Sequence, residues 1–218
     1  MQDIANLQAL IKKELINWAT GVLSKKTDFY SNNPPCPFAQ SALQLGFADV
    51  KYGFGPYMSN VMQTISNYPK EMSMVIHAQI DPKFTAKELK EWTKLHNREV
   101  CKNDLWLISF HPEDDPNENM EDDKDFEELV EEDYALVFVQ NLTELNDASK
   151  VLELKGYYDK LPAEDLAELK IRRKASEDLI MAMGRKGAMK KKRGTGTKDK
   201  AFKKVMPGKA KSRRGRRR

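Results

Sequence analysis

The residues of this sequence best suited to catalysis or metal binding are one cysteine, Cys36, and two histidines, His77 and His111. Thiolate and imidazole groups bind zinc and copper, and a carboxylate such as Asp114 or Asp115 would complete the ligand set. Alternatively, Cys36 is a nucleophile or redox thiol whose pKa is lowered by a neighbouring histidine. We therefore take as candidate catalytic residues Cys36 and His111, and as candidate ligands of a divalent transition metal, zinc or copper, Cys36, His77, His111 and Asp115.

These hypotheses depend on the fold, because the sequence has none of the short motifs that form a site by themselves. Closely spaced pairs such as Cys-x-x-Cys are absent. So are the Gly-x-Gly-x-x-Gly and Walker-type loops that cradle phosphates. No serine, histidine and aspartate stand in a pattern typical of a catalytic triad.

His111 is expected at the rim of a sheet. The run Leu105–Phe110 is apolar and aromatic, which is typical of a buried strand. Pro112 has no N–H to give to a sheet and pushes His111 towards an extended conformation, so the strand should end at the imidazole. The acids Glu113 and Asp114 follow directly, which places carboxylates beside the ring. The alternative is a histidine that ends the strand and forms local hydrogen bonds.

Cys36 is expected on a stiff loop over residues 24–38. Two prolines precede it and one follows, in Pro34-Pro35-Cys36-Pro37, so the thiol is presented in a defined place. The alternative is that Cys36 is a small buried hydrophobic residue, as free cysteines often are.

The elements that must position these residues alternate in the way typical of an α/β fold. We predict one α/β domain over residues 1–161, with a sheet of about four strands packed with helices, followed by a charged helix over 162–184. The predicted strands cover 47–54, 71–78, 105–110 and 134–140, and the predicted helices cover 3–23, 57–67, 86–101 and 142–161. If the strands that carry His77 and His111 are parallel neighbours, both imidazoles lie at the carboxyl edge, where such sheets bind ligands.

Residues 113–133 form an acid-rich segment, with 13 aspartates and glutamates among 21 residues. Such a block is usually a solvated loop. It lacks the Asp-x-Asp-x-Asp-Gly spacing of a calcium loop, although carboxylates are suitable ligands for hard cations. A further alternative is that it folds back on the basic end of the chain.

The last segment, residues 185–218, has 17 lysines and arginines and a single acid, whereas residues 1–184 have a net charge of −12. Its composition is typical of a disordered tail, and its charges can bind the phosphate backbone of RNA or DNA without sequence specificity. An acidic protein is the alternative partner, and a structural or assembly role in holding a polyanion is a further alternative. The candidate nucleic-acid-binding residues are Arg185, Lys186, Lys190, Lys191, Lys192, Arg193, Lys203, Lys204, Arg213, Arg214, Arg216, Arg217 and Arg218.

Composition also limits the compartment. Two cysteines form no disulfide framework and suit a reducing environment. The sequence shows no signal-peptide pattern and no apolar run long enough to span a bilayer. We expect a cytoplasmic protein, or a nuclear one if the host cell has a nucleus, because residues 190–193 have the composition of a nuclear localisation patch.

Two short signatures, Cys36-Pro37-Phe38-Ala39 and Ser109-Phe110-His111-Pro112, resemble an uncharacterised bacterial family catalogued as domain of unknown function 1415. Trp18 and the strand around His77 add to the resemblance, which covers roughly residues 10–155. Members of that family typically carry an Asn-Arg-Ser-Pro-Tyr-Pro segment and a further histidine, and the corresponding region here, residues 131–138, lacks both the arginine and that histidine. The resemblance implies the fold and singles out Cys36, His77 and His111, and it implies no reaction.

Overall fold

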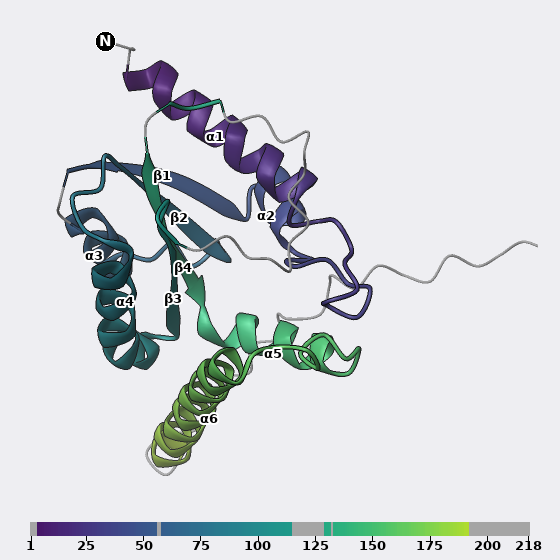
Figure 1. Cartoon of the computed structure of the whole chain (residues 1–218). Helices are drawn as coiled ribbons and strands as arrows, with labels where there is room; N and C mark the ends of the chain where they lie inside the picture. The colour runs from purple at the N-terminus through teal and green to yellow at the C-terminus, as the bar shows by residue number, and fades with distance from the viewer. Residues whose placement is uncertain (1–3, 56–57, 115–128, 132, 192–218) are drawn as a thin grey trace, which may run out of the picture. The chain divides into compact units, whose positions relative to one another are not determined.

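The structure, a computed structural model, describes residues 4–55, 58–114, 129–131 and 133–191, with the backbone alone for 184–191. Its centre is a four-stranded sheet of β1 (Ala48–Phe54), β2 (Met74–Ile80), β3 (Leu105–Phe110) and β4 (Tyr134–Asn141). Helix α1 (Ile4–Gly21) covers one face of the sheet, and helices α3 (Ser59–Ser66) and α4 (Ala86–Val100) cover the other (Figure 1). The predicted α/β fold is confirmed.

The strands lie in the order β1-β2-β4-β3. Strand β1 is parallel to β2, and β4 is antiparallel to both of its neighbours. Strands β2 and β3 are therefore separated by β4, so the condition under which His77 and His111 would lie together at one edge is not met. His77 is opposite Val137 of β4, which is opposite Ser109 of β3, so His77 also lies in the middle of its strand and not near its end.

Strand β4 is buried on both faces, as its continuous apolar sequence predicts. Ala135, Val137 and Val139 face α3 and α4 and are completely buried. Leu136 and Phe138 alternate with them and pack towards α1. Because successive side chains of a strand point to opposite faces, a strand without polar positions needs a layer of helices on each side.

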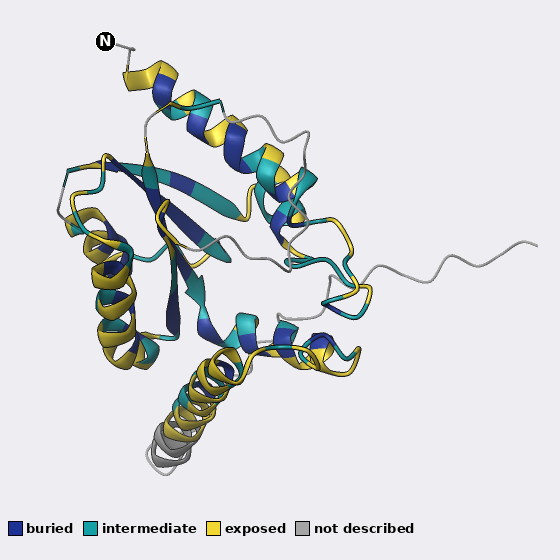
Figure 2. Cartoon of the chain, in the orientation of Figure 1, coloured by how far each residue is buried: buried dark blue, intermediate teal, exposed yellow. Residues whose placement is uncertain are grey.

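Helix α1 provides one of these layers. Leu7, Ile11 and Leu15 recur at helical spacing and are buried against the sheet, while the opposite side of the helix is exposed (Figure 2). The buried carboxylate of Glu14 on the same helix accepts hydrogen bonds from the backbone N–H of Val130 at 3.1 Å and from the Tyr134 hydroxyl. Glu14 thus joins α1 to the end of the acid-rich segment, most of which, residues 115–128, lies outside the described residues.

Helix α4 protects the open edge of the sheet. It begins at a capping box, in which Thr85 and Glu88 exchange hydrogen bonds. Further along, the Asn97 side chain donates to the carbonyl oxygen of Leu107 at 3.0 Å and accepts from its N–H at 2.7 Å. Leu107 lies on β3, which has a strand partner on one side only. Asn97 therefore takes the place of a neighbouring strand at this residue.

The chain after β4 differs from the prediction at two points. Helix α5 (Leu142–Glu153) ends before Gly156, whose φ of +73° favours glycine, so the predicted helix to 161 is too long. Helix α6 (Ala163–Lys191) extends beyond the predicted end near 184, and its last turns include the first residues of the basic segment. A short helix that the sequence did not reveal, α2 (Ala39–Gln44), directly follows the loop of Cys36.

The chain divides into two compact units, Met1–Ala182 and Met183–Arg218. The sheet and helices α1 to α5 belong to the first unit. Among the described residues, no helix combines the length and the apolar character that crossing a membrane requires.

The role of Asn97 predicts a specific loss of stability. Asn97→Ala would leave the N–H and the carbonyl of Leu107, which is 1% exposed, without partners. We expect the free energy of unfolding, measured by urea denaturation, to fall by about 2–4 kcal/mol. Asn103→Ala, at an exposed position between α4 and β3, is the matched control and should change it by less than ~0.5 kcal/mol. Equal losses in both variants would contradict the proposed protection of the edge.

Candidate functional site

His111 joins the end of β3 to the loop before α4. Its imidazole is buried, its Nδ1 accepts a hydrogen bond from the N–H of Glu113 at 3.1 Å, and its Nε2 lies 2.9 Å from the carbonyl oxygen of Phe84. Because Nδ1 accepts, Nε2 carries the proton and donates to Phe84. Asp114 accepts from the His111 backbone N–H at 2.6 Å. Both ring nitrogens are thus occupied, which corresponds to the alternative of a histidine that ends a strand and bonds locally.

His77 is on the side of the sheet that faces α3. Its ring is 2% exposed, and Nε2 lies 2.9 Å from the hydroxyl of Thr64, which itself accepts from Lys51 Nζ at 3.2 Å. The Thr64 hydroxyl therefore links the imidazole of His77 to Lys51 by hydrogen bonds. Burial, with a smaller effect of Lys51, lowers the pKa of His77 from 6.5 to about 4. His77 is neutral at pH 7 and holds strand β2 to α3.

Cys36 lies on the predicted loop, where its N–H donates to the carbonyl of Leu23 at 3.0 Å and its carbonyl accepts from Ala39 at 3.2 Å. The side chain is half-buried and packs beside Ala19, Leu23 and Ala39. Burial raises the pKa of the thiol, and the hydrogen bonds from the backbone of Phe38 and Ala39 oppose this effect only in part. The thiol is therefore less ionised than an ordinary cysteine at neutral pH, unlike an activated nucleophile.

The structure does not bring the three candidate ligands together. Cys36, His77 and His111 form no group that could hold a metal ion, and in the parts of the chain that the structure describes no other three Cys, His, Asp or Glu side chains do so. Asp115 lies outside the described residues.

The candidate nucleic-acid-binding residues also fall largely outside the described part of the chain. The structure places only the backbone of the first four, at the end of α6, namely Arg185, Lys186, Lys190 and Lys191. The others are in residues 192–218, which it does not describe.

A cavity of about 660 Å³ lies beside Cys36. Its walls come from the loop of Cys36, strand β3, and helices α4, α5 and α6. Apolar and aromatic side chains form much of the lining, including Trp106, Leu152, Leu169 and Tyr157. This volume lies within the range of small-molecule sites, which occupy ~300–1,000 Å³.

Thr93 and Ser109 are a pair of hydroxyls in this wall, bonded to each other at 3.0 Å. Tyr158 and Ser149 form a second bonded pair at 3.0 Å. The charged lining residues of α4 and α6, by contrast, are mostly exposed, so the cavity has an apolar interior and a charged rim.

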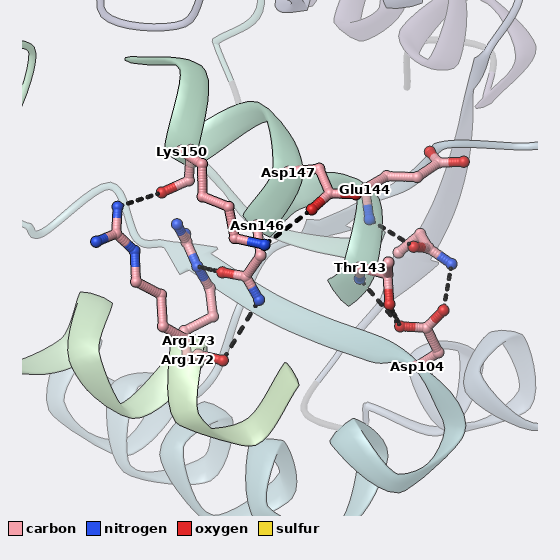
Figure 3. A network of polar contacts seen from close by, with 10 residues as sticks. Asp104, Thr143, Glu144, Asn146, Asp147, Lys150, Arg172 and Arg173 are labelled. Atoms are coloured by element: carbon pink, nitrogen blue, oxygen red, sulfur yellow. Dashed lines mark hydrogen bonds and ion pairs between the residues drawn. The ribbon is translucent and has the colours of Figure 1, made fainter. Parts of the chain in front are cut away.

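Arg172 is the exception to this division, since its side chain is half-buried in the cavity wall. Its Nε donates to Asn146 Oδ1 at 3.2 Å, and the Asn146 amide donates back to the Arg172 carbonyl at 3.4 Å (Figure 3). Among the described residues Arg172 forms no ion pair. Burial lowers the pKa of the guanidinium, while Tyr158 and Glu168 raise it by less.

Helix α5, which carries Asn146, is itself firmly anchored. The carboxylate of Asp104 accepts from the Thr143 N–H at 3.0 Å and from its hydroxyl at 2.7 Å, so it satisfies the first turn of α5 (Figure 3). The N-cap residue Asn141 accepts from the N–H of Glu144 at 2.9 Å. The position of Asn146, and through it of Arg172, is therefore set by the start of α5.

Reasoning from the sequence missed this cavity, because its residues come from elements far apart in the chain. Arg172 and Asn146 have no distinctive neighbours in the sequence. The sequence offers one visible signal of this site, the adjacent arginines Arg172 and Arg173. They lie in a helix that is otherwise rich in charges of both signs.

The chain matches no protein-family model, no curated protein and no solved structure. The resemblance to the uncharacterised bacterial family therefore stays a prediction. Charge and geometry remain as the grounds for a functional proposal.

The environment of His77 predicts how stability depends on pH. In the unfolded chain His77 takes up a proton near pH 6.5, whereas the folded protein resists protonation down to about pH 4. The contribution of the neutral His77 ring to the free energy of unfolding is fully present above pH 6.5 and is lost as the pH falls towards 4. The difference in unfolding free energy between the native sequence and His77→Gln should shrink by about 2–3 kcal/mol from about pH 7.5 to about pH 4.5.

His96→Gln on α4 is the control for this measurement, because it removes a histidine and leaves His77 in place. It should keep the acid-dependent loss of stability of the native sequence. A pH profile of His77→Gln parallel to that of the native sequence would contradict the neutral buried imidazole.

The environment of Cys36 predicts slow thiol chemistry. In a Cys101→Ser background, iodoacetamide at about pH 7.5 should alkylate folded Cys36 several-fold more slowly than the same protein in urea, because only the thiolate reacts. The rate is followed by mass spectrometry. Faster reaction in the folded protein than in urea would restore the hypothesis of an activated nucleophile.

Proposed function

We propose that the protein is nucleic-acid-associated, and that its Lys/Arg-rich C-terminal segment binds the phosphate backbone of RNA or DNA without sequence specificity. The observation that carries the proposal is the division of charge. Residues 185–218 have 17 basic residues and one acid, while residues 1–184 have a net charge of −12. Such clustered charge attracts polyanions by releasing their counterions.

The residue types favour contacts with the backbone over reading of bases. Phe202 is the only aromatic residue among residues 185–218, so little stacking on bases is available. Glycines, alanines and a serine separate the basic groups, a composition that forms no hydrophobic core. The expected binding is therefore strong at low salt, weak at high salt and tolerant of sequence.

Helix α6 overlaps the start of the basic segment. Its backbone is helical to Lys191, so residues 185–191 belong to a helix.

The test is binding of a fluorescent single-stranded oligonucleotide to the full-length chain over a salt series. The native chain should bind at ~50 mM salt and lose several orders of magnitude in affinity by ~200 mM. A full-length variant with all 17 basic residues of 185–218 replaced by glutamine should not bind at either salt concentration. Glutamine is chosen because it preserves helix propensity at the end of α6.

The control is a chain in which residues 192–218 keep their composition in scrambled order. Its affinity and salt dependence should equal those of the native chain, since the proposed contacts need charge and no order. No binding of the native chain at ~50 mM salt, or undiminished binding by the glutamine variant, would overturn the proposal.

A further inference from the structure

We propose that the cavity between β3, α4, α5 and α6 binds a small organic anion, a carboxylate or phosphate monoester that carries an aromatic or apolar group. The oxyanion would bind to Arg172, and the apolar group would lie against the interior around Trp106. This site is separate from the basic segment of residues 185–218, so it extends the function beyond nucleic-acid association.

The first observation is a half-buried arginine that forms no ion pair with any described residue. A guanidinium removed from water is costly unless a negative group pairs with it. Arg172 donates from Nε to Asn146 and also hydrogen-bonds the side chain of Tyr158, and neither partner is a carboxylate. The remaining donors of a planar guanidinium match a carboxylate or phosphate in a two-point arrangement.

The second observation is a neighbouring arginine that increases the positive potential. Arg173 lies next to Arg172 beside α5 (Figure 3), and it donates to Glu153 at 2.8 Å and to Ser149 at 3.2 Å. Its Nε is buried and has no hydrogen-bond partner. Glu153 therefore pairs with Arg173, while Arg172, which lines the cavity, forms no ion pair with a described residue.

The carboxylates that line the cavity form no ion pair with Arg172, although Glu168 raises its pKa by a small amount. Asp165 and Glu168 on α6 are exposed and form no ion pair with it. Asp114, also exposed, accepts from the backbone N–H of His111. Solvent screens charges at the rim more strongly than a charge in the interior, so an anion is favoured next to Arg172.

The opposite rim contributes further positive charge from α4. Lys94 is exposed and forms no ion pair with any described residue, while Lys90 lies 3.5 Å from Glu164. These lysines can draw an anion towards the opening.

The third observation concerns the shape and lining of the interior. Trp106 and Tyr157 are buried aromatic residues in the wall, and Leu152 and Leu169 add apolar surface. The hydroxyls of Thr93 and Tyr158 are already engaged with Ser109 and Ser149. A strongly hydrated ion such as inorganic phosphate would leave this apolar surface uncovered, so a ligand with both an oxyanion and an apolar group fits best.

Cys36 provides a reporter for binding, because it lines the same cavity whereas Cys101 does not. In the full chain with Cys101→Ser, alkylation of Cys36 by neutral iodoacetamide is measured at pH ~8.5, where an ordinary thiol is partly ionised. The salt concentration is ~200 mM, which weakens binding of anions to the basic segment. The probes are phenyl phosphate, benzoate, the neutral benzamide and inorganic phosphate.

We expect phenyl phosphate or benzoate, or both, to slow the alkylation in a saturable way, and benzamide and inorganic phosphate to be at least about tenfold weaker. The stronger of the two organic anions identifies the ligand as a phosphate ester or a carboxylate. Equal protection by benzamide, or no protection by either organic anion, would overturn the proposal.

The variant that tests the anchor is Arg172→Gln, which should weaken protection by the organic anion at least about tenfold. Arg98→Gln, which removes an arginine from the exposed end of α4, is the matched control and should leave protection unchanged. Undiminished protection in a folded Arg172→Gln variant would overturn the assignment of Arg172. If that variant does not fold, Arg172→Lys replaces it, and the comparison of benzoate with benzamide in the native cavity still decides whether an anion is bound.

The full-length glutamine variant of residues 185–218 distinguishes this proposal from the proposed function. It should lose oligonucleotide binding and keep protection of Cys36 by the organic anion. Loss of that protection in the glutamine variant would place the anion on the basic segment and would overturn the cavity site.

Discussion

The apolar character of β4 on both faces is the constraint on which the rest of the structure depends. A strand with buried residues in succession from Ala135 to Val139 cannot face water on either side. It therefore lies between β2 and β3, with α1 packed on one face of the sheet and α3 and α4 on the other. This arrangement leaves β3 at an edge, which Asn97 protects from one side and which borders the cavity.

Polar groups inside the protein are, with few exceptions, satisfied by local partners. The carboxylate of Glu14 accepts from the chain before β4, the neutral ring of His77 is hydrogen-bonded to Thr64, and Asn97 satisfies both backbone groups of Leu107. Such pairing removes most of the cost of burying a polar group. Arg173 differs, because its buried Nε has no hydrogen-bond partner. The neighbouring Arg172 lines the cavity and forms no ion pair with a described residue, so a ligand in the cavity can reach its positive charge.

The charge distribution divides the chain into an acidic part and a basic part. The sheet and its helices belong to an acidic part with a built cavity, whereas the basic groups are concentrated at the C-terminal end. The net negative charge of the acidic part lowers its affinity for polyanions, and the net positive charge of the C-terminal end raises the affinity of that end. Binding of a small anion in the cavity and of a polyanion by the basic segment can therefore be measured and altered independently.

The sequence by itself determined the α/β class, the four strands and the main helices, because hydrophobic periodicity, prolines and the capping box at Thr85 are local signals. The sequence also determined the extent and charge of the basic segment, because charge follows from residue types alone and does not depend on how the chain folds. Only the tertiary structure decided the strand order, which places β4 between the strands of His77 and His111 and gives each imidazole its own local partner. The cavity, too, depends on the tertiary structure, because packing of β3, α4, α5 and α6 brings together residues as distant in the chain as Cys36 and Arg172. Periodicity reports which face of an element is buried, and it carries no information on which distant element covers that face.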